Sequence, residues 1–426
     1  MMVEKILELL RASGADAFEL TDVQKTGWEF YLIRHKLDQN RAKNVEHIRV
    51  KVYKKREDGK FLGSAAGEIA PTASTEEAKT MIEKLLKQAI LVKNPYYEIT
   101  PAYETAKAEE NAADPAAISA DFLRALTSVA ETEGEDINSA EIFVDAVKVR
   151  FINSNGLDVT AVYPSSMAEV VVNARKEEHE IELYRMYRSG TCDGEGLKRE
   201  LEETCVYGRD RLLATPTPAL GTADVVFSTD AALSIYHYFC DRMNTAYVYR
   251  QLSDWEIGKE VLPDVKGDLV TLRTVKTLPN SSRNVPFDGE GAPVRDMTIV
   301  ENGVAKAFWG GRQYSWYLGI KDSFSASNFV VEGGSRTAEE LREGKYLEVV
   351  EFSDFQVDAI TGDIAGEIRL GYWHENGMRT VVTGGSVSGN MKELGRRMCM
   401  SREQKQYDCF LIPAVTRLSG VSITGA

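Results

Sequence analysis

The sequence predicts an α+β protein with a mixed N-terminal α/β unit followed by a β-rich C-terminal domain. Three observations predict this class: apolar residues recur at helical spacing in the first ninety residues, alternating apolar and polar residues dominate from residue 141 onward, and a Thr-Pro-Thr-Pro tract at 215–218 interrupts the chain. The 426 residues suffice for two units with their own cores. We therefore expect domains at 1–215 and 216–426.

Two amphipathic helices are expected in the first unit. The first has apolar residues three or four positions apart, at Val3, Ile6, Leu7 and Leu10. Gly14 follows where a C-cap glycine would end that helix. Ser74 and Glu77 have the spacing of a capping box, which marks the start of the second helix. The chain between these helices is expected to be extended, with an insertion at 28–54.

An acidic segment at 101–140 is the best linker candidate, because it holds nine acidic residues against only Lys107 and Arg124. Part of it is still expected to be helical, with Asp114 as N-cap and Pro115 as the first helical residue. From residue 141 the alternating pattern predicts strands. We expect a β-meander there, joined to the first unit.

The second unit is predicted to begin with a strand at 223–228 and a helix capped by Ser228 or Thr229. The rest is expected to be mostly strand, with turns at 302–303, 362–363 and 376–377, and a short helix near 392–398. The apolar stripe of the capped helix is predicted at Ala232, Ile235, Tyr236, Phe239 and Met243.

Composition excludes several classes of function. The 65 acidic and 51 basic residues give a formal net charge of −14, and no basic stripe offsets it, so direct nucleic-acid binding is not expected. No apolar run of about 18 residues predicts a membrane span, and Glu4 and Glu8 argue against a secretory signal. Five scattered cysteines without a C-x-x-C pair favour a reducing compartment. We expect a cytoplasmic protein.

Five short segments carry a resemblance to a known family. They read F-I-N-S-N-G (151–156), Y-R-Q-L-S with G-K-E-V (249–261), V-P-F-D-G-E-G with M-T-I-V-E-N-G-V (285–304), I-T-G-D-I-A-G-E-I-R-L-G-Y-W-H-E-N-G (360–377) and G-G-S-V-S-G-N (384–390). In this order, with similar gaps, they resemble the TldD/PmbA family of metallopeptidase-related proteins, which are also named modulators of DNA gyrase. The resemblance implies a barrel-like core in the C-terminal domain.

The resemblance also implies a dimer. Family members of the TldD and TldE kinds form pairs that enclose a proteolytic chamber for unfolded peptides. The TldD kind carries H-E-x-x-x-H on a helix, with a distant cysteine, as zinc ligands. The expected partner of this chain is therefore a TldD-like subunit or a second copy of itself, and the expected substrate is unfolded peptide.

One departure from the family motif decides between its two kinds. The corresponding segment, 234–243, contains His237, but Tyr238 stands where the glutamate would be and Arg242 where the second histidine would be. The chain therefore resembles the PmbA/TldE branch, which lacks the zinc motif. We expect no cofactor in this chain and zinc in a TldD-like partner.

This helix could still carry a residual site. His237 and Asp241 lie one turn apart and are the candidates for catalysis. Cys399 falls roughly where the family's downstream cysteine would be, so the three could together bind zinc. The alternative is a solvent- or partner-facing His and Asp pair and a small buried cysteine.

Candidate substrate-binding residues fall in two loops. Small residues near a sheet edge suit capture of a peptide by strand addition, and the alternative is a bulge or sharp corner. These are Gly384, Gly385, Ser386, Gly389 and Asn390. Asp288 and Glu290 could hold a peptide amine or a cation, and the alternative there is an exposed turn.

The leading functional hypothesis is a PmbA/TldE-like subunit that is not catalytic alone and helps to form a peptide-processing chamber. A homodimeric peptidase with an unrecognised site is the first alternative. The second is a protein-binding modulator linked to gyrase or to toxin and antitoxin pathways, as the family name suggests.

Overall fold

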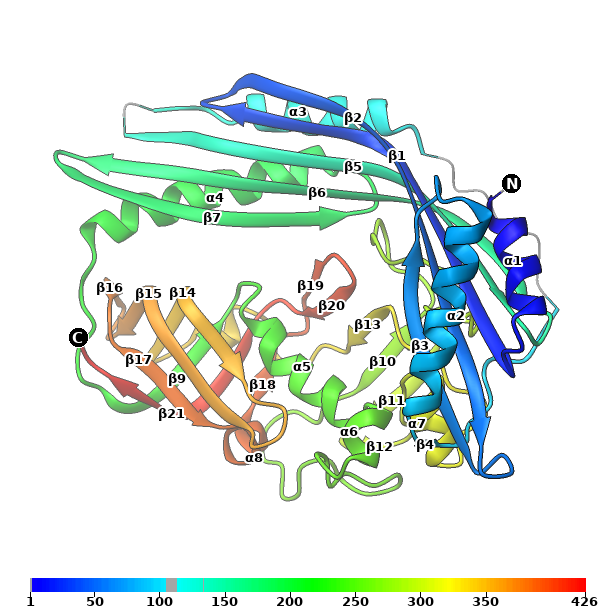
Figure 1. Ribbon diagram of the computed structural model, residues 1–426. Coiled ribbons are helices and arrows are strands. Elements are labelled where there is room, and N and C mark those ends of the chain that lie inside the picture. Colours follow the sequence, from blue (N-terminus) through cyan, green and yellow to red (C-terminus); the bar gives the residue numbers. More distant parts are fainter. Residues whose placement is uncertain (1, 105–112, 133) are drawn as a thin grey trace.

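The computed structural model describes residues 2–104, 113–132 and 134–426. Its N-terminal half is a seven-stranded antiparallel sheet with the order β4-β3-β2-β1-β5-β6-β7. Long strands bend over the rest of the molecule, so we call this sheet the arch (Figure 1). Its strands are β1 (Ala17–Ile33), β2 (Lys36–Arg56), β3 (Phe61–Ile69), β4 (Asn94–Pro95), β5 (Glu135–Asn153), β6 (Asp158–Lys176) and β7 (His179–Ser189).

Four helices cover one face of the arch. Helices α1 (Met2–Ala12) and α2 (Thr75–Leu91) pack over one end, around Leu20, Val50 and Ile82. Helices α3 (Pro115–Thr127) and α4 (Gly194–Leu213) pack over the other end, around Leu32, Ile142 and Leu201. Successive side chains of a strand point to opposite faces, so alternate residues of β1 reach both helix pairs.

Several sequence predictions for this half are confirmed. Ser74 and Glu77 form the capping box of α2, and Asp114 caps α3 with Pro115 in its first turn. The meander predicted after residue 141 forms β5 to β7 and belongs to the arch. The acidic segment 101–140 contains α3 and the start of β5, and its residues 105–112 and 133 lie outside the described residues.

Two expectations are corrected. The segment at 28–54 is not an insertion: it forms most of the β1–β2 hairpin, whose turn at Arg34 and His35 has positive φ angles of 47° and 59°, as a two-residue hairpin turn requires. Helix α4 was not predicted at all. Its contact side is made largely of small or polar residues such as Thr204, Cys205 and Gly208, which hide the apolar periodicity.

The C-terminal half contains a five-stranded barrel, which confirms the predicted fold class. Strands β14, β9, β21, β17 and β15 pair in that order, and β15 pairs again with β14 to close the ring. The strands of this sheet are β8 (Thr215–Pro216), β9 (Gly221–Phe227), β14 (Tyr346–Val357), β15 (Asp363–Glu375), β16 (Met378–Thr383), β17 (Ser386–Asn390), β18 (Cys399–Met400) and β21 (Thr416–Thr424).

A second, six-stranded sheet packs beside the barrel in one core. Its strands are β10 (Leu272–Val275), β11 (Met297–Glu301), β12 (Val304–Ala305), β13 (Asn328–Val331), β19 (Gln404–Tyr407) and β20 (Phe410–Pro413). The helices of this half are α5 (Ala232–Arg242), α6 (Thr245–Tyr249), α7 (Arg312–Tyr317) and α8 (Met391–Leu394), with 3₁₀ turns at Glu340–Arg342 and Gly395–Arg397.

The arch contacts the C-terminal half through its inner face. Phe151 packs with Phe287, and the rings of Tyr97 and Tyr317 meet edge to face at 6.1 Å. The division at residue 215 stays a prediction, and β8 spans it by pairing with β16. Across the described part of the chain, no helix is both long and apolar enough to cross a membrane.

Candidate functional site

Helix α5 is the segment that the resemblance matches to the zinc-binding helix, and one of its sides is buried in the C-terminal core as predicted. The buried residues are Ala232, Ile235, Tyr236, Phe239 and Met243. The predicted caps are wrong, because the helix begins at Ala232 without a side-chain cap. The hydroxyl of Ser228 instead donates a hydrogen bond at 2.6 Å to Glu348 of β14, which pairs with β9.

His237 and Asp241 lie on the other side of α5. The His237 ring is tilted against Phe410 of β20, with 4.6 Å between ring centroids. Although solvent reaches the His237 side chain, surrounding protein atoms desolvate it and lower its pKa, an effect that Asp241 partly offsets. Burial likewise raises the pKa of Asp241, and His237 partly offsets this. Neutral imidazole is thus favoured at pH 7.

Arg242 occupies the position of the motif's second histidine and points away from His237. Its side chain is 2% exposed and lies over the rings of Tyr238 and Trp255, at 5.4 and 4.9 Å from their centroids. Its guanidinium donates to the carbonyls of 359 and 360 at 3.1 Å each and pairs with Asp254. The residue at position 242 therefore belongs to the core. Only His237 and Asp241 remain on α5 as possible metal ligands, and these two do not fit a zinc ion.

Cys399 does not join the pair on α5. It lies on the short strand β18, where Met400 faces the core that contains α5 and Cys399 faces the opposite side, toward Leu341 and Tyr346. Alternation along a strand explains this orientation. Among the residues that the structure describes, no group of three or more His, Cys, Asp or Glu residues could hold a metal ion. The residual metal set His237, Asp241 and Cys399 is therefore not assembled.

The segment 384–390 lies inside the barrel sheet, not near an edge as expected. Strand β17 pairs with β15 on one side and β21 on the other, so no peptide can add to it. Gly385 has a φ of 74°, and an added Cβ would overlap the carbonyl oxygen of Thr424. Asn390 caps α8 by accepting a hydrogen bond from the Lys392 N–H at 2.9 Å. These contacts match the alternative interpretation, a sharp corner.

Asp288 and Glu290 are not in an exposed turn. Asp288 is 8% exposed, and its carboxylate accepts hydrogen bonds from the backbone N–H groups of Glu290, Ala292 and Ser325 at 2.7 to 2.9 Å. Burial raises the pKa of Asp288 despite these bonds. Glu290 accepts from the Arg312 N–H at 2.6 Å. Both carboxylates stabilise the loop by accepting hydrogen bonds from backbone N–H groups. A role in holding an amine or cation stays a prediction.

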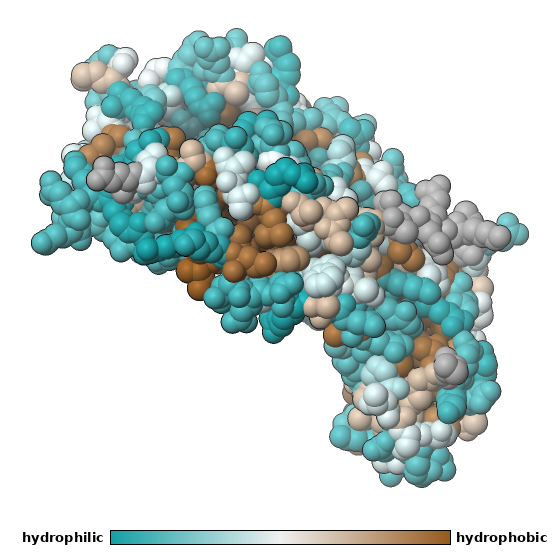
Figure 2. Space-filling model, turned by 90° about the horizontal axis from the view of Figure 1, so that it is seen from above, coloured by the Kyte–Doolittle hydropathy of each residue, from teal (hydrophilic) through white to brown (hydrophobic). Residues whose placement is uncertain are grey.

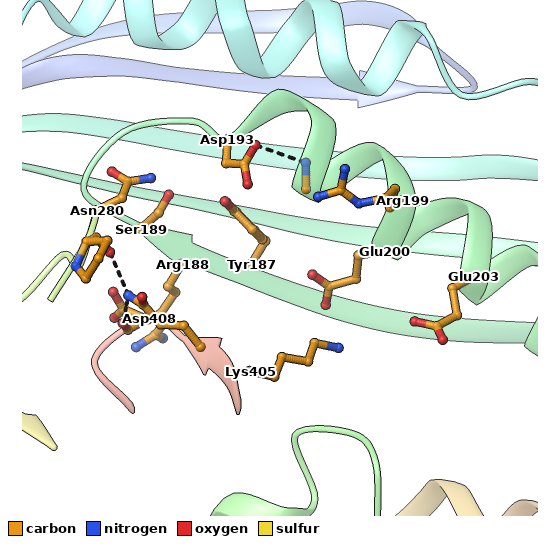
Figure 3. A pocket seen from close by; sticks show the side chains of 13 residues that line it. Tyr187, Arg188, Ser189, Asp193, Arg199, Glu200, Glu203, Asn280, Lys405 and Asp408 are labelled. Atoms are coloured by element: carbon orange, nitrogen blue, oxygen red, sulfur yellow. Dashed lines mark hydrogen bonds between the residues drawn. The ribbon is translucent and has the colours of Figure 1, made fainter. Parts of the chain in front are cut away.

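A cavity lies between the arch and the C-terminal half. It measures about 670 Å³ and is lined by the end of β7, the first half of α4, the loop at 279–280 and the β19–β20 hairpin (Figure 3). The sequence does not predict this cavity, because it predicts neither α4 nor the β19–β20 hairpin. The only local signal was the density of charge at 198–203, which is common on solvated helices.

Comparisons with known proteins place the C-terminal half in a family. Residues 220–425 match the family described as the PmbA/TldA metallopeptidase C-terminal domain. A relative from Haemophilus influenzae, described as a metalloprotease PmbA homolog, is 27% identical over 183 residues, which are 41% of this chain and 40% of the relative. The match thus spans less than half the length of that curated relative.

Two solved structures share the fold along the whole chain. TldE from Thermococcus kodakarensis matches with a TM-score of 0.78 and 16% identity, covering 100% of both chains. A protein described as a modulator of a DNA gyrase, from Thermotoga maritima, matches with a TM-score of 0.78 and 18% identity, covering 100% of this chain and 99% of that one. These two likenesses show the fold of the whole chain, and the family match concerns residues 220–425. Residues 220–425 are a domain of the PmbA/TldD family, and the predicted resemblance is confirmed.

Proposed function

We propose that this chain is a TldE-like subunit of a TldD/TldE-type metallopeptidase system, not catalytic by itself, that helps to form a peptide-processing chamber. The observation that carries the proposal is α5. Its exposed side offers one histidine and one carboxylate, while Arg242 is committed to the core. A zincin needs two histidines and a further ligand around one metal, which this helix does not present.

A partner subunit is supported by the face of the arch opposite its four helices. Cross-strand pairing places Tyr31, Glu141, Glu169 and Met186 in one row on this face, opposite the side buried by α3 and α4. The side chains of Met186 and its neighbour Tyr184 are 42% and 50% exposed. Apolar side chains also gather in an area bordered by hydrophilic residues on the side seen from above (Figure 2). Such areas are typical of interaction surfaces.

Mixing this chain with a TldD-like zinc metallopeptidase tests the proposal. Hydrolysis of an unfolded peptide should be higher for the mixture than for either protein alone, and the two should co-elute in size-exclusion chromatography. A mixture no more active than the TldD-like protein would contradict the proposal.

A His237→Ala variant separates this proposal from an independent peptidase. Zinc measured by elemental analysis should be far below one ion per chain for both the original protein and the variant. The variant should also support the mixture's activity unchanged. Near-stoichiometric zinc that disappears with His237, together with hydrolysis by this chain alone, would establish the independent peptidase instead.

A further inference from the structure

Two segments that are separated in sequence meet at the end of the arch where β2 turns into β3 and α2 ends (Figure 1). Arg56 of β2 donates a hydrogen bond to the carbonyl of Ile90 at 2.6 Å. Lys93 pairs with Glu57 at 2.8 Å and lies over the ring of Phe61 at 4.2 Å from its centroid. These contacts hold the C-terminus of α2 against the β2–β3 turn. We call the surface formed by residues 54–60 and 84–93 the basic end of the arch.

The basic end is strongly cationic in a protein whose net charge is −14. Residues 51–60 and 84–95 hold eight cationic side chains and only two acidic ones. Three of the cations pair with carboxylates. The other five have no carboxylate oxygen within 4.0 Å among the described residues, and these are Lys55, Arg56, Lys60, Lys84 and Lys87. Unpaired cations in this number attract an anionic partner.

Two large apolar side chains protrude from the last turn of α2 beside these cations. Leu91 is 81% exposed, which is the highest value for a large apolar side chain in the described chain, and Ile90 is 47% exposed. Lys84, Lys87 and Leu91 follow at positions i, i+3 and i+7, so they share the side of α2 opposite its buried side. The basic end therefore combines positive charge with aliphatic groups in contact with solvent.

We propose that the basic end of the arch binds the surface of a bilayer rich in anionic lipids, with Leu91 and Ile90 inserted among the headgroups. Clusters of four to eight lysines and arginines on an amphipathic helix are typical of binding to anionic lipids. Long cationic side chains keep their charge at the headgroups while their stems lie along apolar surface. The chain would lie on the bilayer without crossing it.

Charge and apolar exposure together favour a bilayer over other anionic partners. Nucleic-acid phosphates would pair with the lysines but would leave Leu91 and Ile90 in water. An acidic protein would need an apolar pocket for Leu91 within its acidic surface. The interfacial region of a bilayer offers anionic groups and acyl chains side by side, so it satisfies both parts of the basic end.

Co-sedimentation of the full chain with vesicles tests the proposal. The protein should sediment with vesicles of equal parts phosphatidylcholine and phosphatidylglycerol, and should stay in solution with pure phosphatidylcholine. Raising the ionic strength to about 0.5 M should weaken the binding, because salt screens the attraction between lysines and headgroups. Equal sedimentation with both kinds of vesicle, or none with either, would overturn the proposal.

Variants locate the binding surface. Lys84→Gln and Lys87→Gln should each weaken vesicle binding about fivefold, which corresponds to ~1 kcal/mol for one lysine near an anionic surface. Leu91→Ser should weaken it at least about fivefold, because a leucine side chain no longer leaves water. Lys321→Gln and Leu213→Ser are matched controls on exposed residues elsewhere and should bind like the original protein. Equal losses in controls and test variants would show that the basic end is not the binding surface.

Insertion distinguishes a bilayer from other polyanions. In vesicles with brominated acyl chains, the fluorescence of Leu91→Trp should be quenched, whereas that of Leu213→Trp should not. If duplex DNA or polyglutamate binds as tightly as the vesicles, and Leu91→Ser has no effect, the partner is a polyanion and the proposal is wrong. The proposal does not depend on the proposed function, because vesicle binding is measured on this chain alone.

Discussion

The arch and the C-terminal domain differ in their sequence similarity to known proteins, although both share the fold of solved structures. Detectable sequence similarity covers 220–425, whereas the structural likeness covers the whole chain. In the arch, alternating apolar residues face helices, and many apolar side chains satisfy such a pattern. Buried polar groups and close backbone approaches demand particular residues in both regions, as at Gly27 in the arch and at Arg242 and Gly385 in the C-terminal domain. The comparison teaches that the fold extends beyond the part of the chain that the family model matches.

The sharpest test of these demands is Arg242→Ala. The change removes a buried guanidinium from two rings and leaves two carbonyls without a donor, so the free energy of unfolding should fall by ~3 kcal/mol. Urea titration followed by tryptophan fluorescence measures it. Lys259→Ala, which removes an exposed pair with Glu256, is the control and should change stability by less than ~0.5 kcal/mol. Equal losses of stability in the two variants would show that the buried contacts of Arg242 do not stabilise the C-terminal domain.

Glu19→Gln tests a buried carboxylate on the inner face of the arch. Burial is the main cause that raises the pKa of Glu19 to about 7, from an ordinary value of 4.5. The folded protein then holds a proton that the unfolded chain releases above pH 4.5, so Glu19 lowers stability increasingly as the pH rises from 4.5 to 7.

The variant should therefore be more stable than the original protein at pH 8, by at most ~3 kcal/mol, and similar to it at pH 4.5. Thermal unfolding at both pH values measures this difference. Glu83→Gln, on the exposed side of α2, is the control, because Glu83 has no ion pair among the described residues, and it should show no such pH dependence. A gain in stability that is equal at both pH values would show that burial of the Glu19 charge is not its source.

A pair of glycine variants gives the smallest expected effect and isolates steric contact. Gly385 and Gly377 have nearly the same φ, 74° and 75°, so alanine is strained equally at both. Only Gly385 has backbone atoms in the way of an added Cβ, whereas Gly377 has nothing within 4 Å. Gly385→Ala should therefore lower the free energy of unfolding by ~2 kcal/mol more than Gly377→Ala does, as measured by urea titration. Equal losses would mean that the turn conformation alone selects glycine at 384–385.

Local patterns predicted much of the fold. The capping box at Ser74, the helix start at Pro115 and the turn at 376–377 are set by residues a few positions apart, and all are confirmed. Helix α4 was missed because its contact side is small and polar. The interior position of β17 was missed because it depends on pairing with residues about 20 to 40 positions away.

The candidate site also has features set by neighbouring residues and features set by residues far apart in the sequence. The absence of the zinc motif was read directly from 237–242, but the orientation of Arg242 into the core depends on Trp255 and on the loop near 360. The cavity between α4 and the β19–β20 hairpin joins residues about 200 positions apart, such as Glu200 and Lys405. No local pattern marks such a juxtaposition, so only the folded structure reveals it.

Closure of the five-stranded ring through the β14–β15 pairing bears on how this chain resists aggregation. A closed ring leaves few unpaired main-chain groups on its strands, so another chain finds little edge on which to add. The risk of intermolecular pairing then falls on the outermost strands of the other two sheets, β4 and β7 in the arch and β12 and β19 in the six-stranded sheet. Charged and exposed residues such as Arg188 on β7 and Lys405 on β19 discourage self-association along these edges.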